Sequence, residues 1–305
     1  MKKYTVPYEK LSYKDLSLVG GKNASLGEMI KNLTKKGVAV PSGFAVTTES
    51  YWDFLKENGI QEKIEEILKN YDRKSTKSLI ETGKRARKLI MKAELPSDVK
   101  KAITESYREI GKGKNISVAV RSSAVCEDAP DASFAGQFET FLNIFGEENV
   151  LKAVKECIAS SFNDRVIAYR EEKNVPHLEF ALSVGVQRMV RSDLSSSGIM
   201  FTLDTESGFR NVVLINSIFG IGEMIVQGSI TPDEFYVFKP TLEKNYPSII
   251  CKNLGRKTKK FVYKKGGGIK EEQISEKKAL EFSINDEEIL TLARWAVIIE
   301  KHYGK

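Results

Sequence analysis

Apolar residues in the first hundred positions recur three or four apart, which is the periodicity of helices that pack one face on a core. This spacing follows a Gly-Gly-Lys turn within residues 16–33 and predicts a first helix there. It predicts further helices at residues 48–58, 62–70, 77–91 and 97–110. Between them, residues 41–47 have the pattern of a turn that leads into a short strand.

The pattern changes after a small polar stretch at residues 111–115. Short runs rich in β-branched residues predict strands at 116–120, 181–190, 198–203, 212–217, 235–239 and 248–251. One long amphipathic helix is expected at 147–172 and a last one at 286–303. We therefore expect an α+β protein with a mostly helical lobe at residues 1–112, an α+β lobe at 113–305, and a ligand cleft between them.

The turn Gly20-Gly21-Lys22 is a first candidate for anion binding. Two glycines let a ligand approach the backbone, and the start of the following helix offers unpaired N–H groups beside the charge of Lys22. It is not a Walker loop, since Leu16 stands in place of the first glycine and Asn23 in place of the Ser/Thr. Taken alone, this common pattern is better explained as a capped helix with a solvent-exposed lysine.

A more specific signal lies where the strand at 116–120 ends on Arg121. An arginine at a strand end can hold phosphate oxygens through two parallel hydrogen bonds. The small and polar residues at 127–141 can form a loop that folds over phosphates with its N–H groups inward. The alternative, a structural ion pair with Glu127 or Asp128, explains so many small residues less well.

Two further stretches are weaker candidates. Residues 184–190, with Gln187 and Met189, form a strand whose end can offer backbone hydrogen bonds to an adenine, although a plain buried strand explains them equally well. Glu223, in a glycine-rich turn, can contact ribose hydroxyls or a phosphate-bound metal, or can simply cap a helix.

Composition excludes several other classes of protein. With 41% hydrophobic and 29% charged residues, the chain has an ordinary globular balance, and no run of 18 apolar residues predicts a membrane span. The three cysteines are far apart and there are two histidines, which argues against most zinc sites and fits a cytoplasmic protein with reduced thiols. The net charge of +7 includes lysine tracts at 257–260 and 264–265, which we interpret as solvated turn and edge-strand residues. Without a recognisable nucleic-acid motif, we expect no nucleic-acid partner.

Together these stretches resemble the ATP-binding domain shared by pyruvate phosphate dikinases, phosphoenolpyruvate synthases and rifamycin phosphotransferases. The resemblance covers residues 16–305 and is strongest at 20–22, 120–124, 130–136 and 160–165. Residues 186–193, 204–209 and 231–237 look specifically like the synthases.

The resemblance implies a two-lobed ATP-grasp fold that holds ATP and Mg²⁺. Lys22 and Arg121 would hold phosphates and act in catalysis, with Arg87 a weaker candidate. The other positions that match nucleotide-contacting ones in the family are Gly136 and Thr140 in the loop over the phosphates, Gln187 at the nucleotide pocket, and Met189 and Val190, whose backbone would contact adenine.

Family members of the synthase type convert ATP, pyruvate and water to phosphoenolpyruvate, AMP and phosphate, through a histidine that first takes the βγ-phosphoryl group. Their metal-binding glutamate, histidine domain and pyruvate-binding domain follow the region that this chain matches, so the expected metal ligands lie beyond Lys305. His177 and His302 lack the context of the phosphate-accepting histidine. We therefore expect an incomplete part of the enzyme, with its oligomeric state open. The alternatives are a module of a rifamycin-type antibiotic phosphotransferase and a non-catalytic nucleotide-binding remnant.

Overall fold

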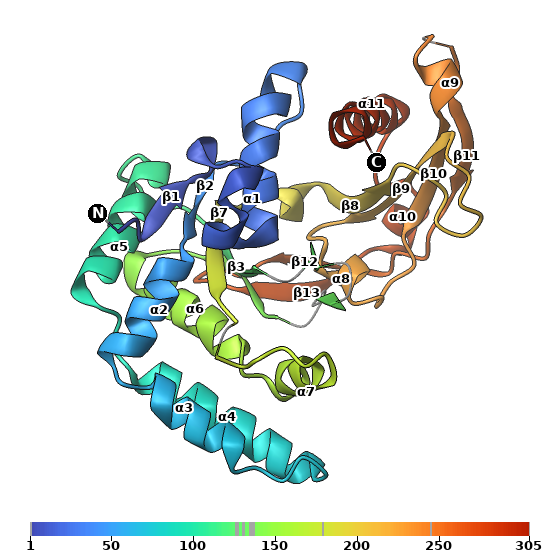
Figure 1. Cartoon of the computed structure of the whole chain (residues 1–305). Helices are drawn as coiled ribbons and strands as arrows, with labels where there is room; N and C mark the ends of the chain where they lie inside the picture. Colours follow the sequence, from blue (N-terminus) through green and yellow to red (C-terminus); the bar gives the residue numbers. More distant parts are fainter. Residues whose placement is uncertain are drawn as a thin grey trace. The chain divides into compact units, whose positions relative to one another are not determined.

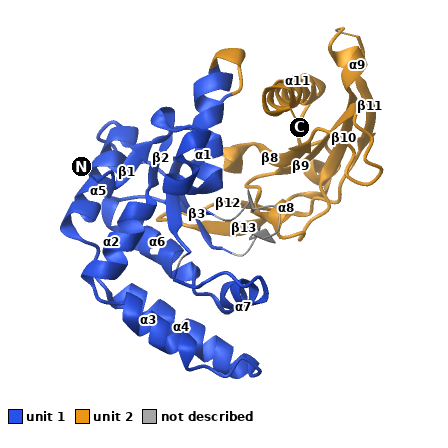
Figure 2. Cartoon of the chain, in the orientation of Figure 1, with its two compact units in different colours: residues 1–34, 39–189 blue, residues 35–38, 190–305 orange. Residues whose placement is uncertain are grey.

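The computed structural model describes residues 2–125, 128–129, 132–133, 138–178, 180–244 and 246–304. The chain forms two compact units (Figure 2). Unit 1 comprises residues 1–34 and 39–189, and unit 2 comprises residues 35–38 and 190–305. Each unit combines helices with an antiparallel sheet, so the protein is α+β as expected. In the described part of the chain, no helix is both long enough and apolar enough to cross a membrane.

Unit 1 is built on one five-stranded sheet in which every neighbouring pair of strands is antiparallel (Figure 1). Its strands, in spatial order, are β1 (Thr5–Pro7), β2 (Gly43–Val46), β7 (Leu182–Arg188), β3 (Val118–Ala124) and β6 (Thr140–Ile144). A separate short pair joins β4 (Asp128–Ala129) and β5 (Ala132–Ser133).

The two faces of this sheet differ in chemistry because successive side chains of a strand point to opposite sides. One face carries Val46, Val120 and Val184, which are buried in a large apolar core. That core is completed by helices, namely α2 (Thr48–Glu57), α3 (Gln61–Lys69), α4 (Thr76–Lys92), α5 (Ser97–Gly111), α6 (Glu147–Ser160) and α7 (Asp164–Glu172). The other face is covered by α1 (Leu16–Leu33) and carries smaller and polar residues.

The division expected after residue 112 falls inside unit 1, between α5 and β3. Strands β1 and β2 precede this point and β3, β6 and β7 follow it, yet all five belong to one sheet. Helices α1, α2 and α5 contact that sheet, whereas α4 packs on α6 and α7, and α3 packs on α4. The residues at 111–115 are therefore a turn within the unit.

The single helix expected at 147–172 is wrong in one respect, because the chain forms two helices, α6 and α7, separated by residues 161–163. The hydroxyls of Ser160 and Ser161 donate to the carbonyls of Cys157 and Ile158, at 2.7 Å each. Serine hydroxyls that bond the preceding turn compete with the regular helical pattern. The amphipathic periodicity continues across this break, which hides it in the sequence.

Unit 2 contains a four-stranded sheet with α11 (Asp286–Tyr303) packed on one face. The strand order is β11 (Ile249–Asn253), β10 (Asp233–Phe238), β9 (Val212–Phe219), β8 (Ser196–Phe201). Apolar side chains such as Ile215 and Phe235 from the sheet meet Ile289 and Ala293 from α11. A hairpin of β12 (Lys259–Tyr263) and β13 (Ile269–Gln273) and the short helices α8 (Glu223–Val226), α9 (Lys239–Leu242) and α10 (Glu276–Ala279) complete the unit.

The interpretation of the lysine tract at 257–260 as solvated is wrong for Lys257. Its side chain is 0% exposed and lies 2.5 Å from an Oδ1 of Asp233, which is equally buried. The other lysines of the tract, Lys259 and Lys260, lie on the hairpin strand β12 and are half-buried. A sequence pattern alone does not show which lysine of a charged run lies beside a buried carboxylate in the folded protein.

Candidate nucleotide site

Arg121 and Gln187, predicted separately from the sequence, meet on the polar face of the unit 1 sheet. The Nη2 of Arg121 donates to the Oε1 of Gln187 at 2.8 Å. The Nε2 of Gln187 donates in turn to the carbonyl of Pro41 at 3.0 Å. Because Pro41 fixes which end of the amide carries the oxygen, Gln187 orients the guanidinium of Arg121.

The rest of the Arg121 guanidinium retains hydrogen-bonding capacity. Its Nε is buried and has no acceptor among the residues that the structure describes. In the sheet register, Arg121 lies between Gly185 of β7 and Thr140 of β6. Gly185 contributes no side chain and Thr140 is exposed. A buried donor without a protein acceptor is costly unless another group accepts its hydrogen, so this arrangement suits an oxyanion.

The helix start at Gly20 lies directly against β3. Gly20 has φ 72° and ψ 166°, a conformation that divides α1 into two helical segments. A Cβ at Gly20 would lie 2.2 Å from the carbonyl oxygen of Ser123, so only glycine fits here. The second helical segment therefore begins beside the strand that carries Arg121, with exposed Lys22 in its first turn.

The sequence did not indicate that Asn23 holds this helix in place. Asn23 is 0% exposed. Its backbone N–H donates to the Oγ of Ser123 at 3.2 Å, and its Nδ2 donates to the Oγ of Ser183 at 3.1 Å. Its Oδ1 accepts from the hydroxyl of Tyr8 at 3.2 Å. The asparagine that stands in place of the Walker Ser/Thr thus ties α1 to β3 and β7, and its position in Gly20-Gly21-Lys22-Asn23 was the one available signal.

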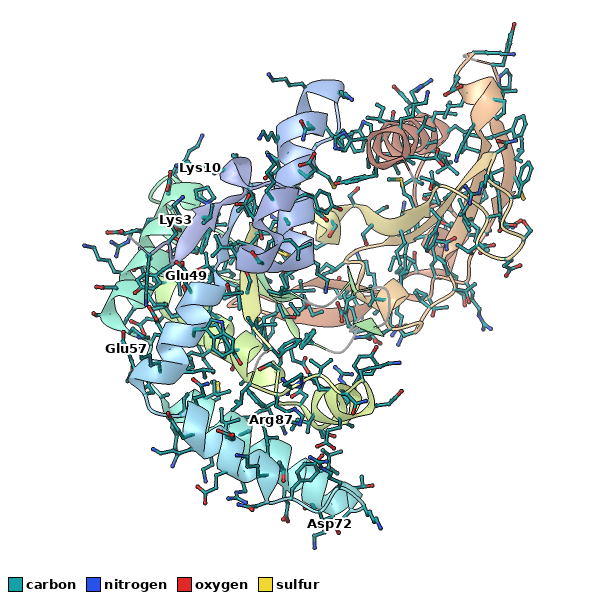
Figure 3. All side chains as sticks on the ribbon, viewed as in Figure 1. Lys3, Lys10, Glu49, Glu57, Asp72 and Arg87 are labelled. Carbon is teal, nitrogen blue, oxygen red and sulfur yellow. The ribbon has the colours of Figure 1, made fainter. Side chains whose placement is uncertain are left out.

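Arg87 lies on α4 (Figure 3) and contacts the turn between α6 and α7. Its Nη1 donates to the carbonyl of Phe162 at 2.8 Å and lies 3.9 Å from an Oδ1 of Asp164. In the same turn, the Nδ2 of Asn163 donates to Glu139, the residue before Thr140, at 3.2 Å. Arg87 and the start of β6 are therefore attached to one common turn.

Of the remaining predicted residues, Gly136 is outside the described residues. Met189 ends unit 1, and its N–H donates to the carbonyl of Ser117 at 2.9 Å. Val190 belongs to unit 2, is 61% exposed, and accepts a hydrogen bond from the hydroxyl of Tyr263 at 2.6 Å.

Glu223 also belongs to unit 2, where it opens the short helix α8. Its Oε1 accepts from the Nε2 of Gln227 at 3.1 Å. As for a metal, the described ranges hold no group of three or more His, Cys, Asp or Glu residues arranged to bind one.

Comparison with known proteins identifies the family to which the chain belongs. The chain belongs to the pyruvate phosphate dikinase, AMP/ATP-binding domain family, whose pattern matches residues 16–305. The resemblance drawn from the motifs is thereby confirmed.

Individual relatives that the chain resembles are phosphoenolpyruvate synthases. It is 50% identical to that of Pseudomonas aeruginosa over 310 residues, covering 100% of this chain and 39% of the relative. It is 49% identical to that of Escherichia coli over 303 residues, covering 98% of this chain and 38% of the relative. It is 48% identical to that of Aquifex aeolicus over 301 residues, covering 97% of this chain and 35% of the relative. The chain thus spans less than two fifths of the length of these relatives.

Proposed function

We propose that this chain is the ATP-binding part of a phosphoenolpyruvate synthase. The observation that carries the proposal is the family match across residues 16–305, together with near 50% identity to proteins named as that synthase. None of these three relatives is named as an antibiotic phosphotransferase, so the synthase is preferred to that alternative.

In this proposal the chain has a two-lobed ATP-grasp fold that binds ATP. Lys22 and Arg121 hold the phosphates, since phosphoryl transfer depends mainly on positioning and on neutralising charge. Gln187 supports Arg121 through the 2.8 Å hydrogen bond, and the buried Nε of Arg121 supplies a further donor. Gly136 belongs to the loop over the phosphates, and Thr140, the first residue of β6, follows that loop.

The other contacts of the nucleotide are as the sequence predicts. The backbone of Met189 and Val190 contacts adenine, as the family resemblance implies, and Glu223 contacts the ribose hydroxyls or a phosphate-bound metal. Mg²⁺ enters with the nucleotide, because this ion is usually bound through substrate phosphates, waters and one or two carboxylates rather than by an all-protein cage.

The whole reaction needs groups supplied from outside the matched region. The βγ-phosphoryl group of ATP passes to a histidine of another domain, and a further domain binds pyruvate. Partners of this chain are therefore those two domains, in a cytoplasmic enzyme that makes phosphoenolpyruvate, AMP and phosphate.

Calorimetric titration with Mg-ATP tests the proposal. Each of Arg121→Ala and Lys22→Ala removes a charged partner of the phosphates, for which a loss of about 1.5–3 kcal/mol, at least tenfold in affinity, is expected. Arg108→Ala is the matched control, because Arg108 is an exposed arginine paired with Glu147 on the apolar-core side of the unit. Undiminished ATP binding by both site variants would rule out these roles.

A further inference from the structure

Arg170 is an arginine buried inside unit 1 that pairs with no carboxylate of the described residues. Its side chain is 0% exposed, and the described residues provide no ion pair for it. Two of its three guanidinium nitrogens, Nε and Nη1, have no acceptor in that same part of the chain. Burial lowers the pKa of Arg170 to about 10, which still leaves the group charged at neutral pH. Removing such a charge from water is unfavourable, so a specific role is expected to offset the desolvation of Arg170.

Two of the contacts that Arg170 makes are with the α6–α7 turn, and a third is with Phe180, which precedes β7. Its Nη2 donates to the carbonyl of Ser161 at 2.6 Å. Its guanidinium lies over the rings of Phe162 and Phe180, with 5.1 Å to each centroid. Both rings are buried, so these cation–π contacts are shielded from water and stabilise the charge. Arg170 therefore holds both the backbone and a side chain of the α6–α7 turn.

The same turn carries groups of the candidate nucleotide site on its other sides. The carbonyl of Phe162, one residue after the acceptor of Arg170, accepts the 2.8 Å bond from Arg87. The side chains of Asn163 and Arg165 lie 3.2 Å and 3.9 Å from Glu139, next to Thr140. The turn is thus attached to the core by Arg170 and to two candidate phosphate-site elements by Arg87 and Glu139.

We infer that Arg170 is a positioning residue that fixes the α6–α7 turn and through it orients Arg87 and the start of β6 toward the nucleotide phosphates. The inference rests on the proposed function for its nucleotide, and on the structure of unit 1 for its contacts. A flexible apolar side chain would fill the same volume without defining the carbonyl directions of the turn. An arginine does so because its planar fork is rigid and each donor has a set direction.

The test uses Arg170→Met in the whole chain, with two measurements. Amide hydrogen exchange in the nucleotide-free protein should become faster at residues 160–165 and 138–142 and stay unchanged in α11. The affinity for Mg-ATP should fall roughly tenfold, while the affinity for adenosine, which lacks phosphates, should stay within about twofold. The melting temperature should change little, since apolar replacement also removes the buried charge.

Matched variants separate positioning from general damage. Arg108→Met, an exposed arginine of α5 that pairs with Glu147, should leave both measurements unchanged. Arg170→Lys keeps the charge and should bind ATP more tightly than Arg170→Met does. If Arg170→Met does not fold, Arg170→Lys takes its place in both measurements. Unchanged exchange in the turn, or equal losses for ATP and adenosine, would overturn the inference. If the unaltered chain binds no ATP, the proposed function fails, whereas the exchange measurement still decides whether Arg170 fixes the turn.

Discussion

Each unit contains a buried polar network, and the two networks differ in the chemistry of their groups. In unit 1, neutral groups of Tyr8, Asn23 and Ser183 bond one another between α1 and the sheet. In unit 2, Asp233 and Lys257 form an ion pair in which both side chains are 0% exposed. Both networks join segments that are far apart in the sequence.

The difference lies in how each network satisfies its atoms. Both carboxylate oxygens of Asp233 accept hydrogen bonds, from Lys257 and from the backbone N–H groups of Gly255 and Ser283, at 2.5 to 2.8 Å. The ion pair thus holds two loops at the start of β10. The neutral network instead lets a helix approach a sheet closely, since a Cβ at Gly185 would lie 2.4 Å from the Oδ1 of Asn23. In unit 2, the ion pair of Asp233 and Lys257 holds two irregular loops together. In unit 1, the lack of a side chain at Gly185 lets α1 pack closely on the sheet beside the candidate site.

Asp233→Ala should have the largest effect, because it leaves Lys257 charged and unpaired in the interior of unit 2. We expect a loss of about 3–5 kcal/mol in the free energy of unfolding, measured by urea denaturation. The double variant Asp233→Leu/Lys257→Met removes both charges and should recover most of the loss. If the single variant costs no more than the double one, the pair is not what holds these loops.

Asn23→Ala should have a smaller effect, because it breaks neutral hydrogen bonds only. The expected loss of unfolding free energy is about 1–3 kcal/mol, since the hydroxyl of Tyr8 and the carbonyl of Val19 lose a partner in the interior. Asn32→Ala is the matched control in the same helix, because Asn32 is only partly buried and bonds Glu28 within that helix. Equal losses for the two variants would show that the network adds nothing beyond local helix structure.

Removing the ion pair between exposed Arg191 and buried Asp193 should have the smallest effect on the free energy of unfolding. Two hydrogen bonds from Arg191, at 2.8 and 2.9 Å, hold the pKa of Asp193 below its usual value of 3.8. A carboxyl with a lowered pKa in the folded state stabilises the protein above its ordinary pKa, and this contribution disappears as the pH falls through the lowered value. We expect less than about 1 kcal/mol, because Arg191 is largely exposed.

Urea denaturation of Asp193→Asn, at neutral pH and well below pH 3.8, measures this term. The variant should be less stable than the unaltered protein at neutral pH, and the two should converge in acid. A difference that persists unchanged in acid would mean that ionisation of Asp193 contributes nothing.

The sequence predicted the regular elements well because local periodicity determines them. The last helix was expected at 286–303 and is α11 (Asp286–Tyr303), where a capping box of Asn285 and Glu288 sets the start. Strand β6 was not expected, since it directly follows a stretch of small and polar residues that resembles a loop. The break between α6 and α7 was also hidden, because it depends on serine side-chain bonds rather than on a loss of periodicity.

For the candidate site, the structure shows where the predicted residues lie and leaves their binding roles as predictions. Arg121 was singled out as an arginine at a strand end, which is wrong, because β3 continues to Ala124 and Arg121 lies in the middle of it. Gln187 on the neighbouring strand is its hydrogen-bond partner. Asn23 was missed as a structural residue because its partners Ser123 and Ser183 are 100 and 160 positions away. The roles of Lys22, Arg121, Gln187 and Glu223 toward a nucleotide stay predictions until binding is measured.

The burial of Lys257 gives the molecule an internal reporter of its own opening. An amine-acylating reagent reacts with lysines that water can reach, and the chain has many of these on its surface. Lys257 is 0% exposed and bonded to Asp233, so it can react only when that part of unit 2 opens. The rate at which Lys257 is modified would therefore measure how often this part of unit 2 opens. Modification of the exposed Lys264 and Lys265 would give the reactivity of the reagent itself.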